Sequence, residues 1–358
     1  MKLGLTIGYS GADMRLPIER VLKAEALGYD SVWTAESYGS DAVTPLAYLA
    51  ALTKRIRLGS GVIQLAARTP ANAAMSAATV DALAGGNRYI VGLGVSGPQI
   101  VEGWYGQPWG RPYYRLRDYI TIMRKIFRRE EPVTHVGKEI SLPYIGPGSS
   151  GLGKPLKSIL HMNPNIPIML GAENEAVVKL CAELCDGLLP LGLVPGTFAK
   201  YRPWLEAGFK RAGGGKSLDK FEIFPIVPVV IDRDVKTALG RMKPDIALYA
   251  GGMGARSKNF HNDLMAQQGF PEAAARIQEL YLAGHKAEAA ASVPDELCDL
   301  RALVGPPERI RERYRAWESS GATGLLIRTA QDAAIDLMAE VAGTEVNQGR
   351  EERILKPQ

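Results

Sequence analysis

Three segments in the first hundred residues repeat one plan, a short apolar run that stops abruptly at small or polar residues. They are residues 30–37, 56–63 and 88–96. Apolar stretches with helical periodicity, residues 43–54 and 71–83, separate them. This alternation is typical of parallel strands joined by helices, whose carboxyl ends all lie on one face. Barrel enzymes carry their chemistry on that face, so the polar residues that end these runs are the first candidates for a functional site.

The same alternation continues along nearly the whole chain. It gives eight strand–helix units, interrupted by two long segments at about residues 130–165 and 251–304. Eight units predict an α/β fold, a closed (β/α)8 TIM barrel in one domain of residues 1–345, with insertions after the fourth and seventh βα units. The first insertion has the length of a functional loop or of one that holds its own hairpin, and the second is predicted to be helical. A doubly wound open sheet is the alternative, and residues 346–358 are predicted to form a charged tail.

Composition and charge exclude several classes of protein. The net charge of +5 is spread along the chain, and its densest basic cluster, residues 124–129, ends an amphipathic helix, where cations favour the helix dipole. No apolar run approaches the roughly 18 residues of a membrane span, and no secretory signal precedes the first strand. Three cysteines make an odd number, and four dispersed histidines fit no metal-ligand spacing. We expect a cytoplasmic protein without a metal that acts on a small molecule and binds no nucleic acid.

The segment Gly92–Gly97 matches the G-x-G-x-x-G pattern of dinucleotide-binding folds. Its context does not fit that fold, because it follows the fourth strand, not the first, and Pro98 stands where a long helix should begin. In a barrel loop, the same glycines allow the backbone to approach a planar ring or a phosphate closely.

Four segments, residues 34–41, 57–64, 92–106 and 166–173, resemble the luciferase-like monooxygenase superfamily, and most of all its actinobacterial branch that depends on coenzyme F420. The resemblance extends from Leu3 to about residue 342. It implies a TIM barrel that binds this deazaflavin and transfers a hydride between the C5 carbon of the cofactor and a small organic substrate. A monooxygenase that uses reduced FMN is the alternative within the superfamily, and a cofactor-binding protein without turnover is another. For the oligomeric state, we allow for a homodimer.

The resemblance also implies a set of residues at the cofactor. It predicts a cis peptide bond between Gly61 and Val62 behind the central ring. Phosphate groups are expected at the backbone of the loop after the fifth strand, although the acidic Glu173 departs from the glycine pair that relatives carry there. The predicted cofactor-binding residues are Glu36, Ser60, Gly61, Val62, Gly94, Val95, Ser96, Gly97, Gly171, Ala172 and Glu173.

The end of the second strand carries the candidate catalytic residues, Glu36 and Ser37. A sugar-phosphate dehydrogenase branch of the superfamily has Asp-His at this place and another acid near the position of Pro98, so the resemblance does not extend to oxidation of glucose 6-phosphate. Glu36 has three open roles: a proton shuttle, a group that positions the ring system, or a structural carboxylate paired with an arginine. The residues expected on the substrate side are Tyr9, Ser10, Gln64, Trp104 and Tyr105.

Overall fold

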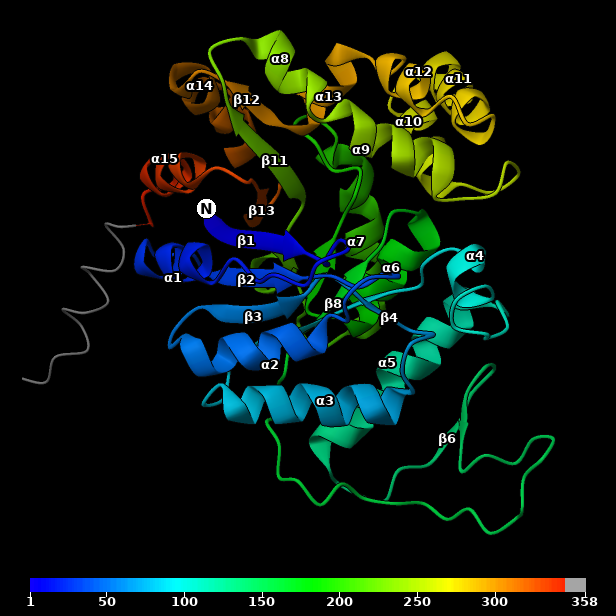
Figure 1. Cartoon of the computed structure of the whole chain (residues 1–358). Helices are drawn as coiled ribbons and strands as arrows, with labels where there is room; N and C mark the ends of the chain where they lie inside the picture. The colour runs from blue at the N-terminus through cyan, green and yellow to red at the C-terminus, as the bar shows by residue number, and fades with distance from the viewer. Residues whose placement is uncertain (345–358) are drawn as a thin grey trace, which may run out of the picture.

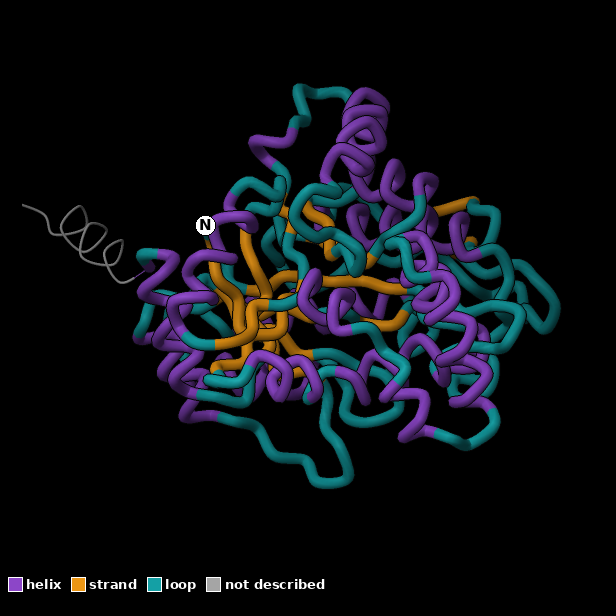
Figure 2. The backbone as a smooth tube through the Cα atoms, turned by 90° about the horizontal axis from the view of Figure 1, so that it is seen from above, coloured by secondary structure: helices purple, strands orange, loops and turns teal. Residues whose placement is uncertain are grey.

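The computed structural model describes residues 1–344, so the predicted charged tail of residues 346–358 lies outside the described residues. Eight parallel strand positions curl into a closed barrel with helices around it (Figures 1 and 2). In barrel order the strands are β1 (Lys2–Gly8), β2 (Ser31–Thr34), β3 (Arg57–Ser60), β5 (Tyr89–Gly94), β8 (Ile168–Gly171), β9 (Gly187–Leu189), β10 with β11 (Glu222–Ile223 and Ile226–Ile231) and β13 (Gly324–Arg328). Parallel pairing of β13 with β1 closes the ring, which confirms the predicted TIM barrel over the open sheet.

Helices wrap the outside of the barrel, and the main apolar core lies between them and the strands. They are α1 (Ile18–Ala26), α2 (Val43–Leu52), α3 (Pro70–Leu83), α5 (Pro112–Arg128), α6 (Glu175–Leu184), α7 (Phe198–Ala212), α14 (Pro307–Glu318) and α15 (Asp332–Ala342). A second apolar cluster fills the inside of the barrel around Trp33, which is fully buried and packs edge-on against Phe224. The barrel interior is therefore closed by side chains, as expected for eight strands. Within residues 1–344, no helix has the length and apolar character needed to cross a membrane.

Charged side chains gather at the amino-terminal ends of the strands. The Arg57 guanidinium contacts Asp30 at 2.6 Å and Glu222 at 2.8 Å, and Lys2 contacts the same Glu222 at 2.6 Å. Each residue begins its strand or directly precedes it. Burial would raise the pKa of Glu222, but the hydrogen bonds and charges of Arg57 and Lys2 outweigh it and bring the pKa below its usual value.

The first insertion leaves the barrel between α5 and β8. It begins with an antiparallel hairpin, β6 (His135–Val136) and β7 (Ser141–Leu142), which is separate from the barrel sheet. The Asp118 carboxylate fixes the hairpin, because it accepts hydrogen bonds from the backbone N–H groups of Glu139 and Ile140 at 2.8 and 3.0 Å. The chain then runs out as an extended arm at the lower right of Figure 1. Large apolar side chains of the arm are exposed, among them Ile145, Leu152 and Ile159.

The second insertion forms a helical cap with its own apolar core. The cap, residues 235–302, contains α8 (Val235–Gly240), α9 (Lys243–Ala247), the π-helical turn η2 (Leu248–Gly252), α10 (Phe260–Gln267), α11 (Pro271–Leu282), α12 (Lys286–Ala291) and α13 (Asp295–Arg301). The barrel with its two insertions after the fourth and seventh units is therefore the predicted fold.

Two details of the seventh unit differ from the prediction. The strand expected over residues 222–231 is divided into β10 and β11, with Pro225 between them, because proline has no N–H to donate to a sheet. The cap is also followed by an unpredicted strand, β12 (Leu303–Gly305), which pairs in parallel with Val229–Ile231. Three residues are too short a run to show the alternating pattern that reveals a strand.

Candidate functional site

The carboxyl end of the barrel carries an apolar surface around Val62. The peptide bond between Gly61 and Val62 is cis, as the resemblance predicts, and it joins β3 to the short strand β4 (Ile63–Gln64), which pairs with β5. Val62 is partly exposed, and its side chain lies beside two strand ends that have no side chain. A Cβ atom at Gly94 would lie 2.5 Å from Cγ2 of Val62, and one at Gly171 would lie 3.6 Å from Cγ1. The Val62 side chain therefore packs directly over Gly94 and beside Gly171, and a larger residue at Gly94 would displace it.

The Glu36 carboxylate lies just after β2 and is almost completely buried. It accepts hydrogen bonds from the backbone N–H groups of Gln64 and Ala42, at 2.9 and 3.1 Å, and both oxygens bind Nη1 of Arg68 at 2.8 and 2.9 Å. The Gln64 side chain returns a hydrogen bond of 2.8 Å to the Glu36 carbonyl. Glu36 thus ties the end of β2 to the loop that carries Val62, and the geometry favours the structural role with arginine among the three predicted for it.

Two of the candidate serines, Ser60 at the end of β3 and Ser37 after β2, have different surroundings. Ser60 is fully buried, and its hydroxyl both donates to the Gly92 carbonyl at 3.1 Å and accepts from the Gly92 N–H at 2.9 Å. The hydroxyl is thus held inside the barrel wall, and the predicted place of Ser60 at the cofactor stays a prediction that concerns its backbone. Ser37 accepts a hydrogen bond of 3.2 Å at its carbonyl from the Tyr105 hydroxyl. Two residues predicted from the sequence, Ser37 and Tyr105, are thereby brought together.

The loop after β5 contains Val95, Ser96 and Gly97. Ser96 adopts a left-handed backbone conformation with φ of 65°, and the loop leads into α4 (Pro98–Val101), a single turn of helix. A dinucleotide-binding fold would have a long helix here, so the structure agrees with the interpretation of these glycines as a barrel loop. The side-chain amide of Gln99 in α4 donates to the carbonyl of Met253 in the cap.

The loop after β8 contains Gly171, Ala172 and Glu173. The Glu173 carboxylate turns away from the loop toward α7, where it accepts hydrogen bonds from the Tyr201 hydroxyl and from the N–H groups of Leu191 and Gly192. Burial raises its pKa. Three donors within the protein already occupy the carboxylate, so the predicted cofactor contact of Glu173 falls to its backbone and stays a prediction. The acid does not stand in the way of an anion at the backbone of Gly171 and Ala172.

The cap reaches three of the loops that follow barrel strands. The Tyr38 hydroxyl, after β2, contacts the sulfur of Met253 at 3.9 Å. The Lys258 ammonium lies 4.9 Å from the centre of the Trp109 ring, in the region after β5. The side chain of Gln268 donates to the carbonyl of Gly192, after β9, at 3.3 Å. No local pattern predicts these contacts, since their partners are far apart along the chain.

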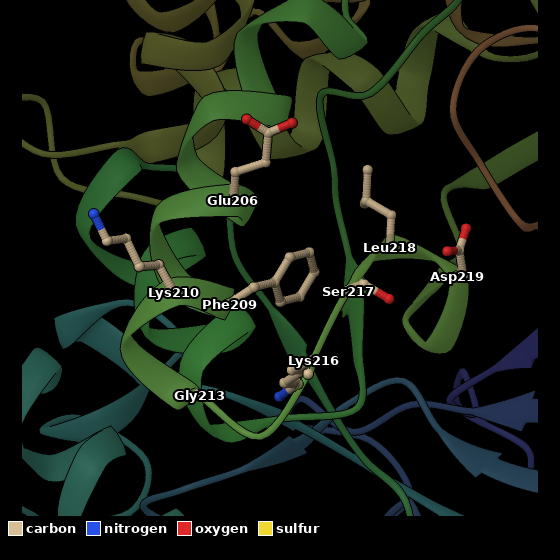
Figure 3. A pocket seen from close by; sticks show the side chains of 9 residues that line it. Glu206, Phe209, Lys210, Gly213, Lys216, Ser217, Leu218 and Asp219 are labelled. Atoms are coloured by element: carbon tan, nitrogen blue, oxygen red, sulfur yellow. The ribbon is translucent and has the colours of Figure 1, made fainter.

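A groove of about 600 Å³ lies at the other end of the barrel, between α7 and the short helix η1 (Leu218–Lys220). Figure 3 shows the Phe209 ring pointing into it, with Lys210 and Leu218 on either side. This segment connects a helix to the next strand, so it belongs to the amino-terminal end. Because barrel enzymes work at the carboxyl end, we base the candidate site on the residues around Val62 and not on this groove.

The described cysteines and acidic groups give no sign of a disulfide or a metal centre. Cys181, Cys185 and Cys298 are free and buried. In the described part of the chain, no three side chains among His, Cys, Asp and Glu come together as a metal site.

Comparisons with known proteins relate this geometry to a family. The model of a family described as luciferase-like monooxygenase matches residues 3–324. A Mycobacterium tuberculosis protein, provisionally named a coenzyme F420-dependent oxidoreductase, is 48% identical over 329 residues, which are 91% of this chain and 94% of the relative. A 5,10-methylenetetrahydromethanopterin reductase of Archaeoglobus fulgidus is 27% identical over 302 residues, or 84% and 85% of the two chains.

A solved structure shares the whole architecture. The coenzyme F420-dependent tetrahydromethanopterin reductase of Methanopyrus kandleri matches with a TM-score of 0.77 at 22% identity, over 95% of this chain and 97% of that one. At this identity the likeness concerns the fold. The family match covers nearly the entire barrel, and the chain belongs to the luciferase-like monooxygenase family of oxidoreductases.

Proposed function

We propose that the protein is an oxidoreductase that uses coenzyme F420 and transfers a hydride between the C5 carbon of this cofactor and a small organic substrate. The observation that carries the proposal is the surface at Val62, flanked by Gly94 and Gly171, at the end of the barrel where this architecture performs its chemistry. The 48% identity to the provisionally named F420-dependent relative supports the choice of cofactor.

The residues present fit a deazaflavin. A planar ring needs an apolar surface without projecting side chains, and Val62 between two glycines offers one. The backbone of Gly171 and Ala172 precedes α6, whose N-terminal amides attract an anion such as the phosphate of the cofactor tail. Bound there, a deazaflavin would supply a carbon that gives or takes a hydride. Backbone contacts would fall to Gly61, Gly94, Val95, Ser96 and Gly97.

The chain's own residues set the position of this surface. Glu36 and Arg68 hold the loop that carries Val62, so we assign Glu36 to positioning and not to proton transfer. Ser37 and Tyr105, joined by a hydrogen bond, border the same end of the barrel and belong to the substrate side. Precise placement of the two reacting groups accounts for a large part of such catalysis.

The alternatives are a monooxygenase that uses reduced FMN and a binding protein without turnover. Titration of the purified protein with F420 and with FMN, followed by fluorescence quenching, separates them. We expect F420 to bind more tightly. Tenfold tighter binding of FMN, about 1.4 kcal/mol in its favour, would replace the proposal by the monooxygenase. Tight F420 binding without hydride exchange toward any substrate in a broad panel would leave a binding protein.

We also propose that the protein works in the cytoplasm on a small molecule, without nucleic acid, and that it forms a homodimer. The exposed apolar side chains of the hairpin and the arm, such as Val136 and Ile159, support self-association, because surfaces of this kind are commonly covered by a partner. Light scattering of the purified protein measures its mass in solution, and a monomer would contradict the dimer.

A further inference from the structure

His261 of the cap has an imidazole ring without a hydrogen-bond partner in the described part of the chain. It lies in the first turn of α10, where the side chain of the buried Asn259 accepts hydrogen bonds from the N–H groups of His261 and Asn262 at 3.0 and 3.2 Å. The amide of Asn259 donates in turn to the carbonyls of Tyr249 and Ala250. The backbone of His261 is therefore fixed, while both ring nitrogens remain free to bind another group.

Aromatic rings hold the imidazole on both sides. The centre of its ring is 4.8 Å from that of Tyr249 and 4.2 Å from that of Phe260. Burial, helped by the positive charge of Arg301, lowers the pKa of His261 to about 4. The ring is therefore uncharged at neutral pH, and a substrate or cofactor bound beside it would have to stabilise the imidazolium.

Contacts from two well-separated strands of the barrel lead to His261. Tyr249 interacts with Tyr9, the residue directly after β1. From the other side, Arg301 donates to Oε1 of Gln268 at 2.8 Å, and Gln268 donates to the carbonyl of Gly192 after β9. In the barrel, β1 is the first strand and β9 the sixth. His261 therefore packs on Tyr249, which reaches the carboxyl end of β1, and belongs to the cap that also contacts the loop after β9, above the end of the barrel where we place the site.

Three acidic groups at this end of the barrel, Glu36, Glu173 and Asp41, are already occupied. Glu36 is bound by Arg68 and two backbone N–H groups, and Glu173 by Tyr201 and two more. Asp41 accepts from the N–H groups of Val43 and Thr44, each at 2.8 Å. Proton transfer by any of them would first require these bonds to break.

We propose that His261 exchanges with the substrate the proton that accompanies hydride transfer, and that the substrate is an alcohol or the corresponding carbonyl compound. The inference rests on the proposed function. During oxidation, the C–H hydrogen leaves with two electrons for the oxidised deazaflavin. The O–H bond breaks, its proton moves to the free imidazole nitrogen, and the C=O double bond forms. In the reverse direction the imidazolium returns the proton to the carbonyl oxygen.

The test compares His261→Asn with a matched variant, His285→Asn. His285 is an exposed histidine of the same cap, paired with Glu288 at 2.8 Å. Oxidised F420 is first titrated by fluorescence quenching, and we expect both variants to bind it within about threefold of the wild type. The wild-type protein, labelled with 15N-histidine, is then loaded with F420 and mixed with a panel of primary and secondary alcohols. The His261 resonance, assigned by its absence from the variant, should shift, and that of His285 should stay.

Turnover gives the second readout, measured as alcohol-dependent reduction of F420. His261→Asn should lower kcat by roughly 10² to 10⁴ with little change in KM, and added imidazole should restore part of the rate of His261→Ala. If F420 binds but no alcohol shifts the His261 resonance, the role of His261 is refuted while the proposed function stands. The same holds if His261→Asn keeps its turnover. If F420 does not bind the wild type, the proposed function fails together with it.

Discussion

The two ends of the barrel use similar residues in opposite ways. At the amino end, Lys2, Asp30, Arg57 and Glu222 are partners of one another, and their charges are satisfied within the protein. At the carboxyl end, β1, β5 and β8 finish in glycines, and His261 has no hydrogen-bond partner among residues 1–344 for its ring. Charged groups that pair with one another stabilise the barrel at its amino end, whereas side chains without a partner at the carboxyl end mark where a ligand belongs.

The Glu36–Arg68 pair complicates this division. It lies at the carboxyl end but is built like the pairs at the amino end, with each charge held by protein groups. Its position joins stability to function, because the loop that it holds carries Val62. Three substitutions test how far the two ends are independent.

The largest effect is expected from Gly94→Val. A Cβ at Gly94 would lie 2.5 Å from Cγ2 of Val62, so the new side chain would push Val62 out of the surface where we place the cofactor ring. F420 affinity, measured by fluorescence titration, should fall about 100-fold, or about 2.8 kcal/mol. Gly11→Val is the matched control, because nothing lies within 4 Å of a Cβ at Gly11. Unchanged affinity in a folded Gly94→Val protein would remove this surface from the cofactor site.

Glu36→Gln should affect both stability and binding. The change leaves the half-buried Arg68 without its counter-charge, and breaking such a pair costs about 3 kcal/mol in the free energy of unfolding. The loop with Val62 loosens, so F420 affinity should fall as well, while turnover at saturating F420 survives. Chemical denaturation measures the free energy of unfolding, and fluorescence titration measures F420 affinity. Glu272→Gln, at an exposed position, is the control. A loss of turnover by two orders of magnitude at full stability would restore Glu36 as a proton shuttle.

Arg57→Met should reduce stability without touching the site. It removes the cation shared by Asp30 and Glu222, and because these side chains keep some contact with water, we expect a loss of about 2 kcal/mol. F420 affinity should stay at the wild-type value. A clear fall in affinity would show that the two ends of the barrel are coupled.

The pH dependence of stability provides a second test of the charged cluster at the amino end of the barrel. Because the folded protein lowers the pKa of Glu222, the ionised carboxylate contributes stability above its unfolded pKa, and this contribution is lost as pH falls through the lower, folded pKa. Urea unfolding between neutral and acidic pH should therefore show a smaller decrease in Arg57→Met and in Glu222→Gln than in the wild type. Equal slopes in all three proteins would contradict a role for Glu222.

The sequence predicted what depends on periodicity and on short motifs. The eight units, both insertions and the cis bond before Val62 follow from alternating apolar runs and from the resemblance of residues 57–64 to the family. What it could not predict depends on contacts distant along the chain. Arg68 as the partner of Glu36 is one case, and the path from Tyr9 through Tyr249 to His261 is another, since neither has a local pattern. The single-domain boundary at residue 345 stays a prediction.

The cap has a consequence for how such enzymes diversify. Its apolar core is separate from that of the barrel, and it joins the barrel through the segment next to β11 and through β12. A lineage that exchanged the segment between Ile231 and Leu303 would therefore keep the main barrel core and would have to refit only Val230, Val304 and the loop contacts of the cap. Such an exchange would replace the loop over the barrel end and His261 in one event. The range of substrates and the proposed source of the proton would then be inherited as a single unit, while the surface around Val62, where we place the cofactor, stays with the barrel.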